Sequence, residues 1–206
     1  MDNDKIITAR IEDKLEQCEH GSYITATGFL NMHEQSLAMR IVRGRSDVKS
    51  FFYGGYDDAE RRIIIFVPDG YADTLEDVLE MISPLSVLHI KVAPGSRKLT
   101  HRDYLGSVLS LGLDRSVIGD ILVNDKGTAM IVNSDIVDFL LSEFHSAGHT
   151  NLQITASDIG ELEVPEQRVK AVRDTLSSPR LDNVVSAAFH VSRSEAVRAI
   201  KGGIVF

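Results

Sequence analysis

The spacing of apolar residues predicts a chain of three segments, and the first of them, residues 1–82, begins with two helices. Apolar positions three or four residues apart share one helical face: Ile7, Ile11, Leu15 and Cys18. This spacing predicts an amphipathic helix that ends at Gly21. Asn31, followed three residues later by Glu34, has the pattern of a capping box and predicts a second helix that ends near Gly44.

Two strands and a short helix complete the first segment. Apolar and β-branched residues predict strands at about 48–53 and 62–67, joined by a turn that carries Gly54-Gly55. Thr74, with Asp77 three residues later, predicts the start of a short helix. We therefore expect an N-terminal α/β domain of two layers.

The Gly54-Gly55 pair raises the question of a phosphate-binding loop. No Gly-Lys-Ser/Thr sequence follows it, and the acidic residues from Asp57 to Glu60 would repel an anion. We therefore expect a turn that needs a positive φ at glycine. The sequence leaves a binding role open for three neighbours: Tyr53, Tyr56 and Arg61.

The second segment, residues 83–163, alternates strands and helices. The predicted elements are strand 85–92, a helix from Thr100 to about Gly112, strands 120–123 and 128–132, a helix from Ser134 to Gly148, and strand 151–156. Residues 124–127 read Asn-Asp-Lys-Gly, which predicts a hairpin. The order βαββαβ is that of the ferredoxin-like fold and of the RNA-recognition motif (RRM), so we predict an RRM-like domain and an α+β chain.

Base stacking on this predicted sheet is not expected. The RRM stacks bases on aromatic side chains of its two central strands. Here those strands, 85–92 and 128–132, contain no Phe, Tyr or Trp. We expect the fold without that binding face, with RNA contacts made by basic loops that recognise shape and backbone.

The third segment, residues 164–206, follows an acidic linker and holds two predicted helices. Ser178-Pro179 has the pattern of an N-cap followed by proline at the first helical position. The inward face of this helix is expected to carry Leu181, Val184, Val185 and Ala188. Ser192 and Glu195 form a capping-box pattern for the second helix, which Gly202-Gly203 would end before a strand at 204–206.

Net charge complicates this picture. The 206 residues carry 22 Lys plus Arg against 30 Asp plus Glu, and the resulting charge of −8 opposes binding to phosphate. The charge is uneven, because the three segments carry −7, −4 and +3, and residues 89–115 alone carry +3. Two basic patches therefore stand in an acidic chain, and we expect the first segment to avoid RNA.

Simple patterns exclude several other classes of protein. The longest fully apolar run, residues 63–67, is far shorter than the roughly 20 residues of a membrane-spanning helix, and the acidic N-terminus is not that of a signal peptide. The single cysteine, Cys18, excludes an internal disulfide and favours a reducing cytoplasm. His145 and His149 show no third ligand, so no metal or other cofactor is predicted.

The third segment resembles the S4 RNA-binding motif. In that motif one helix opens with Arg-Leu-Asp, a second opens with Ser-Arg, and a glycine and a short strand follow. The matching residues keep this spacing: Arg180, Leu181, Asp182, Ser192, Arg193, Ala196, Ile200, Gly203 and Val205. The Val-Asn-Gly continuation of the strand is missing, so we expect a truncated S4 domain.

Two further stretches resemble the YlmH family. Residues 51–56, Phe-Phe-Tyr-Gly-Gly-Tyr, and residues 59–61, Ala-Glu-Arg, match its first domain, whereas residues 101–107 and the stretch on to Val123 match its central domain. The resemblance covers nearly the whole chain. It implies a bacterial S4-domain RNA-binding protein linked to cell division and to ribosome-associated quality control of obstructed large subunits that carry peptidyl-tRNA.

The basic residues of the two patches are the predicted RNA contacts. In the third segment they are Arg180, Arg193, Arg198 and Lys201, together with the hydroxyl of Ser192, where the start of the second helix also suits a phosphate. In the second segment they are Arg97, Lys98, His101, Arg102 and Arg115. Asp103, which lies among them, is expected to cap a helix instead.

These residues predict a non-catalytic protein that docks structured rRNA or tRNA on the large ribosomal subunit. One alternative is a protein-interaction adaptor of the division machinery that uses the acidic first segment. Another is an RNA-modifying enzyme, because Arg180-Leu181-Asp182 resembles the catalytic motif of S4-bearing pseudouridine synthases. In those enzymes a catalytic domain follows the S4 domain, whereas here the motif lies inside the S4 pattern.

Overall fold

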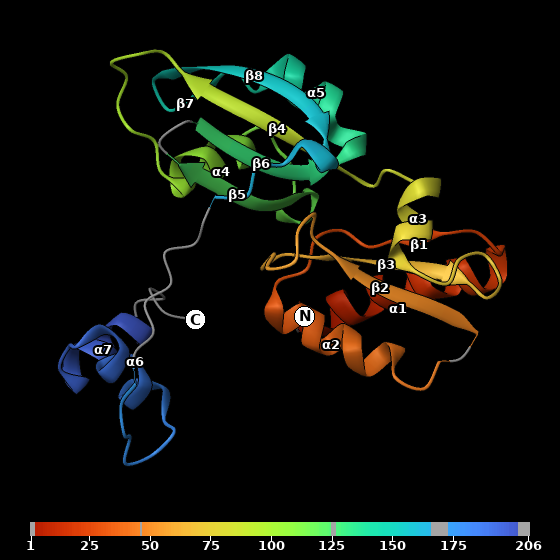
Figure 1. The fold of residues 1–206 in the computed structure, drawn as a ribbon, viewed down its shortest axis with the longest axis horizontal. Coiled ribbons are helices and arrows are strands. Elements are labelled where there is room, and N and C mark those ends of the chain that lie inside the picture. The colour runs from red at the N-terminus through yellow and green to blue at the C-terminus, as the bar shows by residue number, and fades with distance from the viewer. Residues whose placement is uncertain (1–2, 46, 125–126, 166–172, 202–206) are drawn as a thin grey trace. The chain divides into compact units, whose positions relative to one another are not determined.

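The computed structural model describes residues 3–45, 47–124, 127–165 and 173–201 (Figure 1). The chain divides into two compact units, Met1–Pro165 and Glu166–Phe206, which we call the first unit and the second unit. The first unit contains the first and second predicted segments together. The predicted division between residues 82 and 83 lies inside this unit and stays a prediction.

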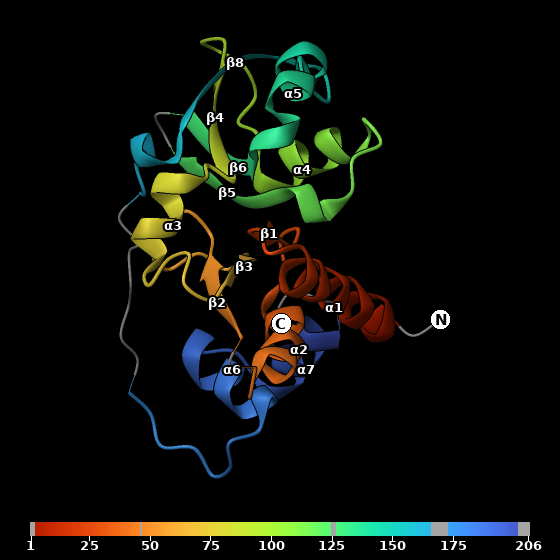
Figure 2. The same cartoon turned by 90° about the vertical axis from the view of Figure 1, so that its right-hand side faces the viewer.

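The first half of the first unit is a three-stranded antiparallel sheet with helices on both faces. Its elements are α1 (Asn3–Gly21), β1 (Thr25–Ala26), α2 (Met32–Val42), β2 (Val48–Tyr53), β3 (Ile63–Pro68) and α3 (Leu75–Met81). The strand order is β1-β3-β2. Figures 1 and 2 show α1 and α2 on one face of the sheet and α3 on the other. The strand β1 escapes sequence prediction, because two residues give no alternation.

The central strand β3 accounts for the longest apolar run in the sequence. All six of its residues are buried. Ile64 and Phe66 pack against α1 and α2, whereas the odd-numbered residues join a second core with Val78 of α3 and Ile131 of the other half of the unit. Because both faces are covered, the strand is apolar throughout instead of alternating. The two halves of the first unit therefore share one core.

The second half of the first unit is a five-stranded antiparallel sheet with helices on one face. Its elements are β4 (Leu85–Val92), α4 (His101–Leu109), η1 (Arg115–Val117), β5 (Ile118–Asn124), β6 (Gly127–Asn133), η2 (Ser134–Ile136), α5 (Val137–Glu143), β7 (Ser146–Ala147), β8 (Thr150–Asp158) and η3 (Ile159–Glu161). Figure 2 shows α4 and α5 on the same side of the sheet. The strand order is β5-β6-β4-β8-β7, and its four long strands have the ferredoxin-like arrangement. The predicted α+β class is confirmed.

Local sequence signals are confirmed at several turns and helix starts. Capping boxes begin α2 at Asn31, α3 at Thr74 and α4 at Thr100, as predicted. Gly55 has a φ of 94°, so the predicted turn with positive φ is present. Asn124 pairs with the residue at 127 across the predicted hairpin, whose central residues 125–126 lie outside the described part of the chain.

Two predicted details of the next helix are wrong. Ser134 does not cap α5 but begins the 3₁₀ helix η2, and its hydroxyl donates to the Ser83 carbonyl at 2.7 Å. The helix α5 ends at Glu143 rather than near Gly148, because residues 146–147 form the strand β7 beside β8. The spacing of apolar residues in a helix predicts neither the hydrogen bond from Ser134 to Ser83 nor the pairing of β7 with β8.

The second unit contains two helices, α6 (Leu181–Phe189) and α7 (Arg193–Lys201), which pack against each other. The predicted start at Ser178-Pro179 is wrong, because α6 begins at Leu181 and the hydroxyl of Ser178 accepts a hydrogen bond from Asn183 Nδ2 at 2.9 Å. Three residues of the predicted inward face are exposed, namely Leu181, Val184 and Ala188, whereas Val185 is buried.

The start of α7 agrees with its sequence pattern. The Glu195 N–H donates to Ser192 Oγ at 3.3 Å, and the Ser192 N–H donates to Glu195 Oε2 at 2.9 Å. This exchange is the predicted capping box. The predicted helix end at Gly202-Gly203 and the strand at 204–206 lie outside the described residues.

Candidate nucleic-acid interface

A buried aspartate joins the two halves of the first unit. Asp120, at the start of β5, is 9% exposed. Its carboxylate accepts from the Tyr56 hydroxyl at 2.8 Å and from the backbone N–H groups of Glu60 and Arg61 at 2.8 and 3.1 Å. Burial, followed by the hydrogen bond to Asp120, raises the pKa of Tyr56 well above its usual value. Tyr56 and Arg61, whose roles the sequence leaves open, are therefore anchors of this junction.

Two arginines of the same junction bind carbonyl oxygens. The Arg61 guanidinium donates to the carbonyls of Phe29, Ile118 and Arg115 at 3.0, 3.0 and 3.3 Å. The Arg115 guanidinium donates to the carbonyls of Ile118 and Gly119. Burial and the charge of Arg61 lower the pKa of Arg115 to about 10. Arg115, a predicted RNA contact, is thus already engaged by carbonyls of its own turn, three and four residues away, whereas Arg61 reaches across the junction.

Close backbone contacts fix the two halves against each other. A Cβ at Gly28 would lie 2.8 Å from Ser116 Cβ, and the neighbouring Phe29 N–H donates to the Ser116 carbonyl at 2.6 Å. A Cβ at Gly55 would lie 2.7 Å from Ile159 Cδ1 of η3. Side chains are therefore excluded at both glycines, and the junction is a tight contact.

The sheet face that binds bases in the RRM is partly covered in this chain. Ile131 of β6, on the face opposite α4 and α5, is buried in the core shared with β3, and Ile159 and Leu162 pack against this core. His89 and Lys91 of β4 line an open groove on the remaining part of this face, with the carboxylates of the 161–163 stretch beside them. No Phe, Tyr or Trp is among the described residues that line that groove.

The predicted basic loop lies at the start of α4. Arg97 donates to Asp103 Oδ1 at 2.8 Å, and the Arg97 side chain remains 61% exposed. Asp103 caps α4, as predicted, and its pKa falls to about 2 because it accepts from the Thr100 backbone and from Arg97. Partial burial and the charge of Arg115 lower the pKa of His101. Lys98 and Arg102 are exposed beside them.

A buried carboxylate pairs two arginines in the second unit. Asp182 is 8% exposed and accepts from Arg180 Nε at 3.1 Å through Oδ1 and from Arg193 Nε at 2.6 Å through Oδ2. The two arginine side chains are 68% and 56% exposed. The terminal nitrogens of both guanidinium groups have no partner among the described residues. This Asp182 clasp therefore presents two guanidinium groups to solvent, an arrangement that suits a phosphate.

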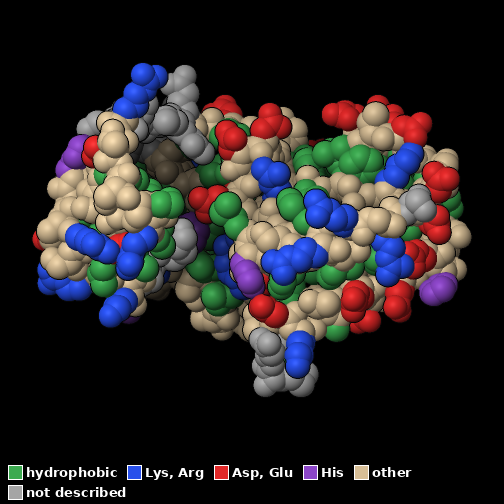
Figure 3. All heavy atoms as spheres, turned by 90° about the horizontal axis from the view of Figure 1, so that it is seen from below, with side chains coloured by type: hydrophobic (Ala, Val, Ile, Leu, Met, Phe, Trp, Pro, Cys, Tyr) green, Lys and Arg blue, Asp and Glu red, His purple; other side chains and the backbone are tan. Residues whose placement is uncertain are grey.

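The other predicted contacts of the second unit differ in how they are held. Arg198 and Lys201 are exposed in the last turn of α7. Figure 3 shows Lys and Arg side chains spread over the second unit, on the left, whereas acidic side chains are interspersed on the first unit. The Ser192 hydroxyl donates to Glu195 Oε2 at 2.6 Å, so its oxygen is engaged in the cap of α7.

Sequence reasoning missed what Asp182 does. The Arg-Leu-Asp pattern marks the residue, but its second partner, Arg193, is eleven positions away. The apolar pattern of α6 also gives no signal, because Asp182 is a charged residue on the buried side of that helix. A buried charge needs an oppositely charged partner, and here that partner comes from the next helix.

The described residues show neither a membrane-spanning helix nor a cluster of metal ligands. Within the ranges described above, no helix is both long enough and apolar enough to cross a membrane. Among the same residues, no three His, Cys, Asp or Glu side chains gather in a way that could hold a metal ion.

The fold and these basic surfaces are typical of RNA-binding proteins, and comparison with known proteins identifies the family. Residues 84–161 match a family model described as "Putative RNA-binding domain in YlmH". A Bacillus subtilis (strain 168) protein described as "Ribosome-associated protein quality control protein P2" is 32% identical over 179 residues, which are 87% of this chain and 67% of the relative. The chain belongs to the YlmH family.

A solved structure supports the fold. The "Cell division protein ylmH from Streptococcus pneumoniae" superimposes with a TM-score of 0.62 at 19% sequence identity. The match covers 80% of this chain and 96% of that one. The α+β architecture is therefore one that this family has in an independently solved member.

Proposed function

We propose that this protein binds structured rRNA or tRNA on the large ribosomal subunit and acts in ribosome-associated quality control. The observation that carries the proposal is the Asp182 clasp, which holds Arg180 and Arg193 together within an S4 pattern. Paired guanidinium groups match the geometry of phosphate oxygens. The name of the Bacillus subtilis relative supports the ribosomal setting.

In this proposal each of the two basic surfaces makes its own set of contacts with RNA. The second unit grips the RNA backbone through Arg180, Arg193, Arg198 and Lys201. The loop at the start of α4 adds a second contact through Arg97, Lys98, His101 and Arg102, with Arg115 behind them. Shape and backbone recognition follow, since neither surface offers an aromatic platform for bases.

A non-catalytic role agrees better with Asp182 than an RNA-modifying role does. Both carboxylate oxygens of Asp182 accept from arginines, and the residue is 8% exposed. A nucleophilic aspartate needs an oxygen that reaches its substrate. Mass spectrometry of rRNA and tRNA from a deletion strain should therefore find no missing modification.

The main experiment measures binding of the full chain to purified large ribosomal subunits by filter retention across a salt series. Arg193→Glu combined with Lys201→Glu should weaken binding at least tenfold and reduce the slope of log affinity against log salt by about 1.5, because about two phosphate contacts are lost. A matched control, Arg40→Glu with Arg43→Glu on α2, changes the net charge equally and should bind like the parent chain.

The outcome of this experiment is decisive for the site. Unchanged affinity and slope in the Arg193→Glu, Lys201→Glu variant would remove the second unit from the interface. Equal losses in both variants would mean that net charge alone, and not this surface, controls binding.

The adaptor role in cell division is the second candidate, and the name of the solved Streptococcus pneumoniae relative favours it. Pull-down of the chain after nuclease treatment separates the two candidates. A protein partner that survives nuclease and that needs only the first segment, 1–82, would support the adaptor role.

A further inference from the structure

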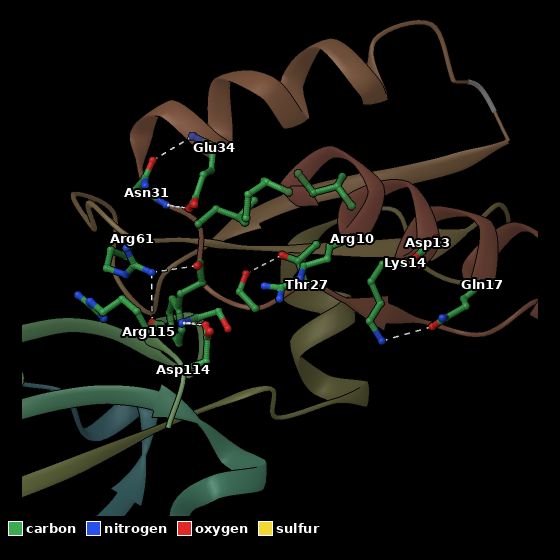
Figure 4. A pocket seen from close by; sticks show the side chains of 16 residues that line it. Arg10, Asp13, Lys14, Gln17, Thr27, Asn31, Glu34, Arg61, Asp114 and Arg115 are labelled. Atoms are coloured by element: carbon green, nitrogen blue, oxygen red, sulfur yellow. Dashed lines mark hydrogen bonds between the residues drawn. The ribbon is translucent and has the colours of Figure 1, made fainter. Parts of the chain in front are cut away.

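We propose that a groove in the first unit, between α1 and the turn at Asp114, binds one unpaired nucleotide of RNA. The inference rests on the proposed function and deepens it, because it adds a contact on the segment whose negative charge seemed to exclude RNA. Figure 4 shows the groove and the side chains around it. Its volume is about 520 Å³, within the range of sites for small ligands.

The groove has two walls from different halves of the unit. One wall is α1, which contributes Arg10 and Lys14, and the other is the turn that carries Asp114 and Arg115. The Phe29 N–H donates to the Ser116 carbonyl at 2.6 Å, which ties the segment after β1, also part of the groove lining, to this turn. The site is therefore already formed without a ligand, which lowers the entropic cost of binding.

The cations of α1 are available to a ligand. Arg10 is exposed and makes no hydrogen bond or ion pair to any described residue. Lys14 donates only to the uncharged Gln17 side chain, at 3.3 Å. The two are four residues apart, so they lie one helical turn apart on the same side of α1, where Figure 4 shows both beside the groove.

Two of the three carboxylates that line the groove accept from local N–H groups, and the hydrogen bond from Ser116, followed by the charge of Arg10, lowers the pKa of Asp114. Glu34 accepts from the Asn31 N–H at 2.8 Å in the cap of α2, and Asp114 accepts from the Ser116 N–H at 2.8 Å. Neither forms an ion pair with Arg10 or Lys14. A phosphate can therefore approach these cations without displacing an existing ion pair.

A nucleotide fits this combination of groups better than an acidic peptide does. Four apolar side chains line the groove; Ile7 is half-buried and offers a surface for a base, whereas Ile11, Phe29 and Leu30 are buried. Carboxylates accept from the exocyclic amino groups of bases, and the Asn31 amide can donate to a base carbonyl. An acidic peptide would place several carboxylates against Asp13, Glu34 and Asp114, and the groove would repel it.

The groove lies beside the predicted RNA contacts of the second segment. Arg115 lines it and is also the residue whose charge lowers the pKa of His101 at the start of α4. RNA bound at His101 and Arg102 would therefore reach the groove within the same compact unit. An unpaired nucleotide next to a structured element is the ligand that this juxtaposition suits.

The test measures anisotropy of a fluorescent single-stranded hexaribonucleotide with the full chain across a salt series. Arg10→Ala with Lys14→Ala should weaken binding about fivefold and reduce the salt slope by about 1.4, the value for two contacts on a single strand. The matched control is Arg40→Ala with Arg43→Ala, which removes equal charge from α2 of the same unit and should leave affinity and slope unchanged. Equal affinities in all three proteins would overturn the inference.

Competitors identify the ligand. A nucleoside monophosphate should displace the hexaribonucleotide at a concentration at least tenfold lower than inorganic phosphate needs, because the base adds apolar and hydrogen-bonding contacts. Equal potency of phosphate, or displacement by an Asp-rich hexapeptide, would overturn the nucleotide assignment.

A parallel arm separates this inference from the proposed function. Arg180→Ala with Arg193→Ala is tested for binding to large ribosomal subunits. If that variant loses affinity while Arg10→Ala, Lys14→Ala still binds the hexaribonucleotide like the parent, the groove is overturned and the proposed function stands. If the second-unit variant loses nothing, the proposed function fails.

Discussion

The two units of this chain use the same pair of residue types, a buried aspartate and two arginines, in opposite ways. In the first unit Asp120 accepts from a hydroxyl and two backbone N–H groups, while Arg61 and Arg115 donate to carbonyls. In the second unit Asp182 accepts directly from Arg180 and Arg193. The first arrangement uses the charges to join two halves of a unit, and the second displays them.

Burial separates these roles, since Arg61 and Arg115 are half-buried and Arg180 and Arg193 are exposed, but the acceptor matters as much. A guanidinium that donates from several nitrogens to fixed carbonyls has lost its freedom to bind a ligand. A guanidinium held by Nε alone keeps its two terminal nitrogens in the geometry that phosphate oxygens need. The difference teaches that arginines in an RNA-binding chain should be sorted by what already holds them, before their number is counted.

The largest expected effect is on the joining arginine of the first unit. Arg61→Ala removes a partly buried guanidinium that donates to three carbonyls, and those carbonyls lose their partners. We expect the free energy of unfolding to fall by about 3 kcal/mol, measured by urea denaturation. Arg62→Ala is the control, because Arg62 donates only within its own loop, to Ala59 and Asp57, and it should cost about 1 kcal/mol.

A fall no larger than that of Arg62→Ala would contradict the joining role of Arg61. The comparison between the units would then break, because the arginines of the first unit would be no more structural than those of the second.

The displaying arrangement is tested by Asp182→Asn. The amide keeps the shape of the side chain but removes its charge and one of its two acceptor oxygens, so Arg180 and Arg193 are no longer oriented together. We expect affinity for large ribosomal subunits to fall about tenfold at low salt, with a smaller change in the salt slope than Arg193→Glu produces. Helix content by circular dichroism should stay that of the parent, and unchanged affinity with unchanged helix content would contradict the clasp.

A smaller effect is expected where Asp120 loses one of its three donors. Tyr56→Phe removes the hydroxyl that donates at 2.8 Å, and the two backbone N–H donors remain. We expect a loss of about 1 kcal/mol in the free energy of unfolding, and no change in RNA affinity. A drop in RNA affinity at unchanged stability would mean that the joining network also orients a binding surface.

The smallest effect is expected at Arg97. This arginine pairs with a carboxylate that caps a helix, Asp103, and its side chain is also exposed. Its partner Asp103 has a pKa of about 2, below the ordinary 3.8, so ionisation of Asp103 favours the folded state. The contribution is present above about pH 4 and is lost as the pH falls through about 2. In Arg97→Ala the pKa of Asp103 should rise but stay below 3.8, because the Thr100 N–H, its largest cause, still donates.

A carboxyl carbon titration by NMR measures this shift. Asp77 is the internal control, since it caps α3 from Thr74 in the same way and should not respond to the substitution. An unchanged pKa at Asp103 would show that Arg97 does not pair with it in solution.

Sequence predicts the parts of this structure whose partners are close in the chain. The caps at Asn31, Thr74 and Thr100 need only a carboxylate three residues later, and all three are present. Ser134 and Ser178 are residues that favour an N-cap but lack a carboxylate three residues later, and Ser134 binds the Ser83 carbonyl while Ser178 binds Asn183. The hydroxyl of a serine can be engaged by a partner that the cap pattern does not include, and the serine then does not cap the helix.

The same distinction between partners that are close in the chain and partners that are distant applies to the candidate site. The sequence marks Arg180 and Arg193 through an ordered motif, but the carboxylate that joins them belongs to a buried position that no spacing rule assigns. Arg61 and Arg115 look alike in sequence, since each is a basic residue near acidic neighbours. Arg61 reaches the Phe29 carbonyl of its own half, 32 residues away, and Asp120 of the other half, 59 residues away, whereas Arg115 donates to carbonyls only three and four residues away.

The shared strand β3 also has a consequence for how the chain is made. A ribosome synthesises β3 well before Ile131 of β6, whose side chain helps to cover the odd-numbered face of the strand. During that interval the second half is missing from the cover of this face, and the strand is a continuous apolar segment of the kind that associates with other chains. Slow translation or a stop codon between residues 83 and 131 should therefore yield an aggregating fragment, even though every element of the first sheet is complete.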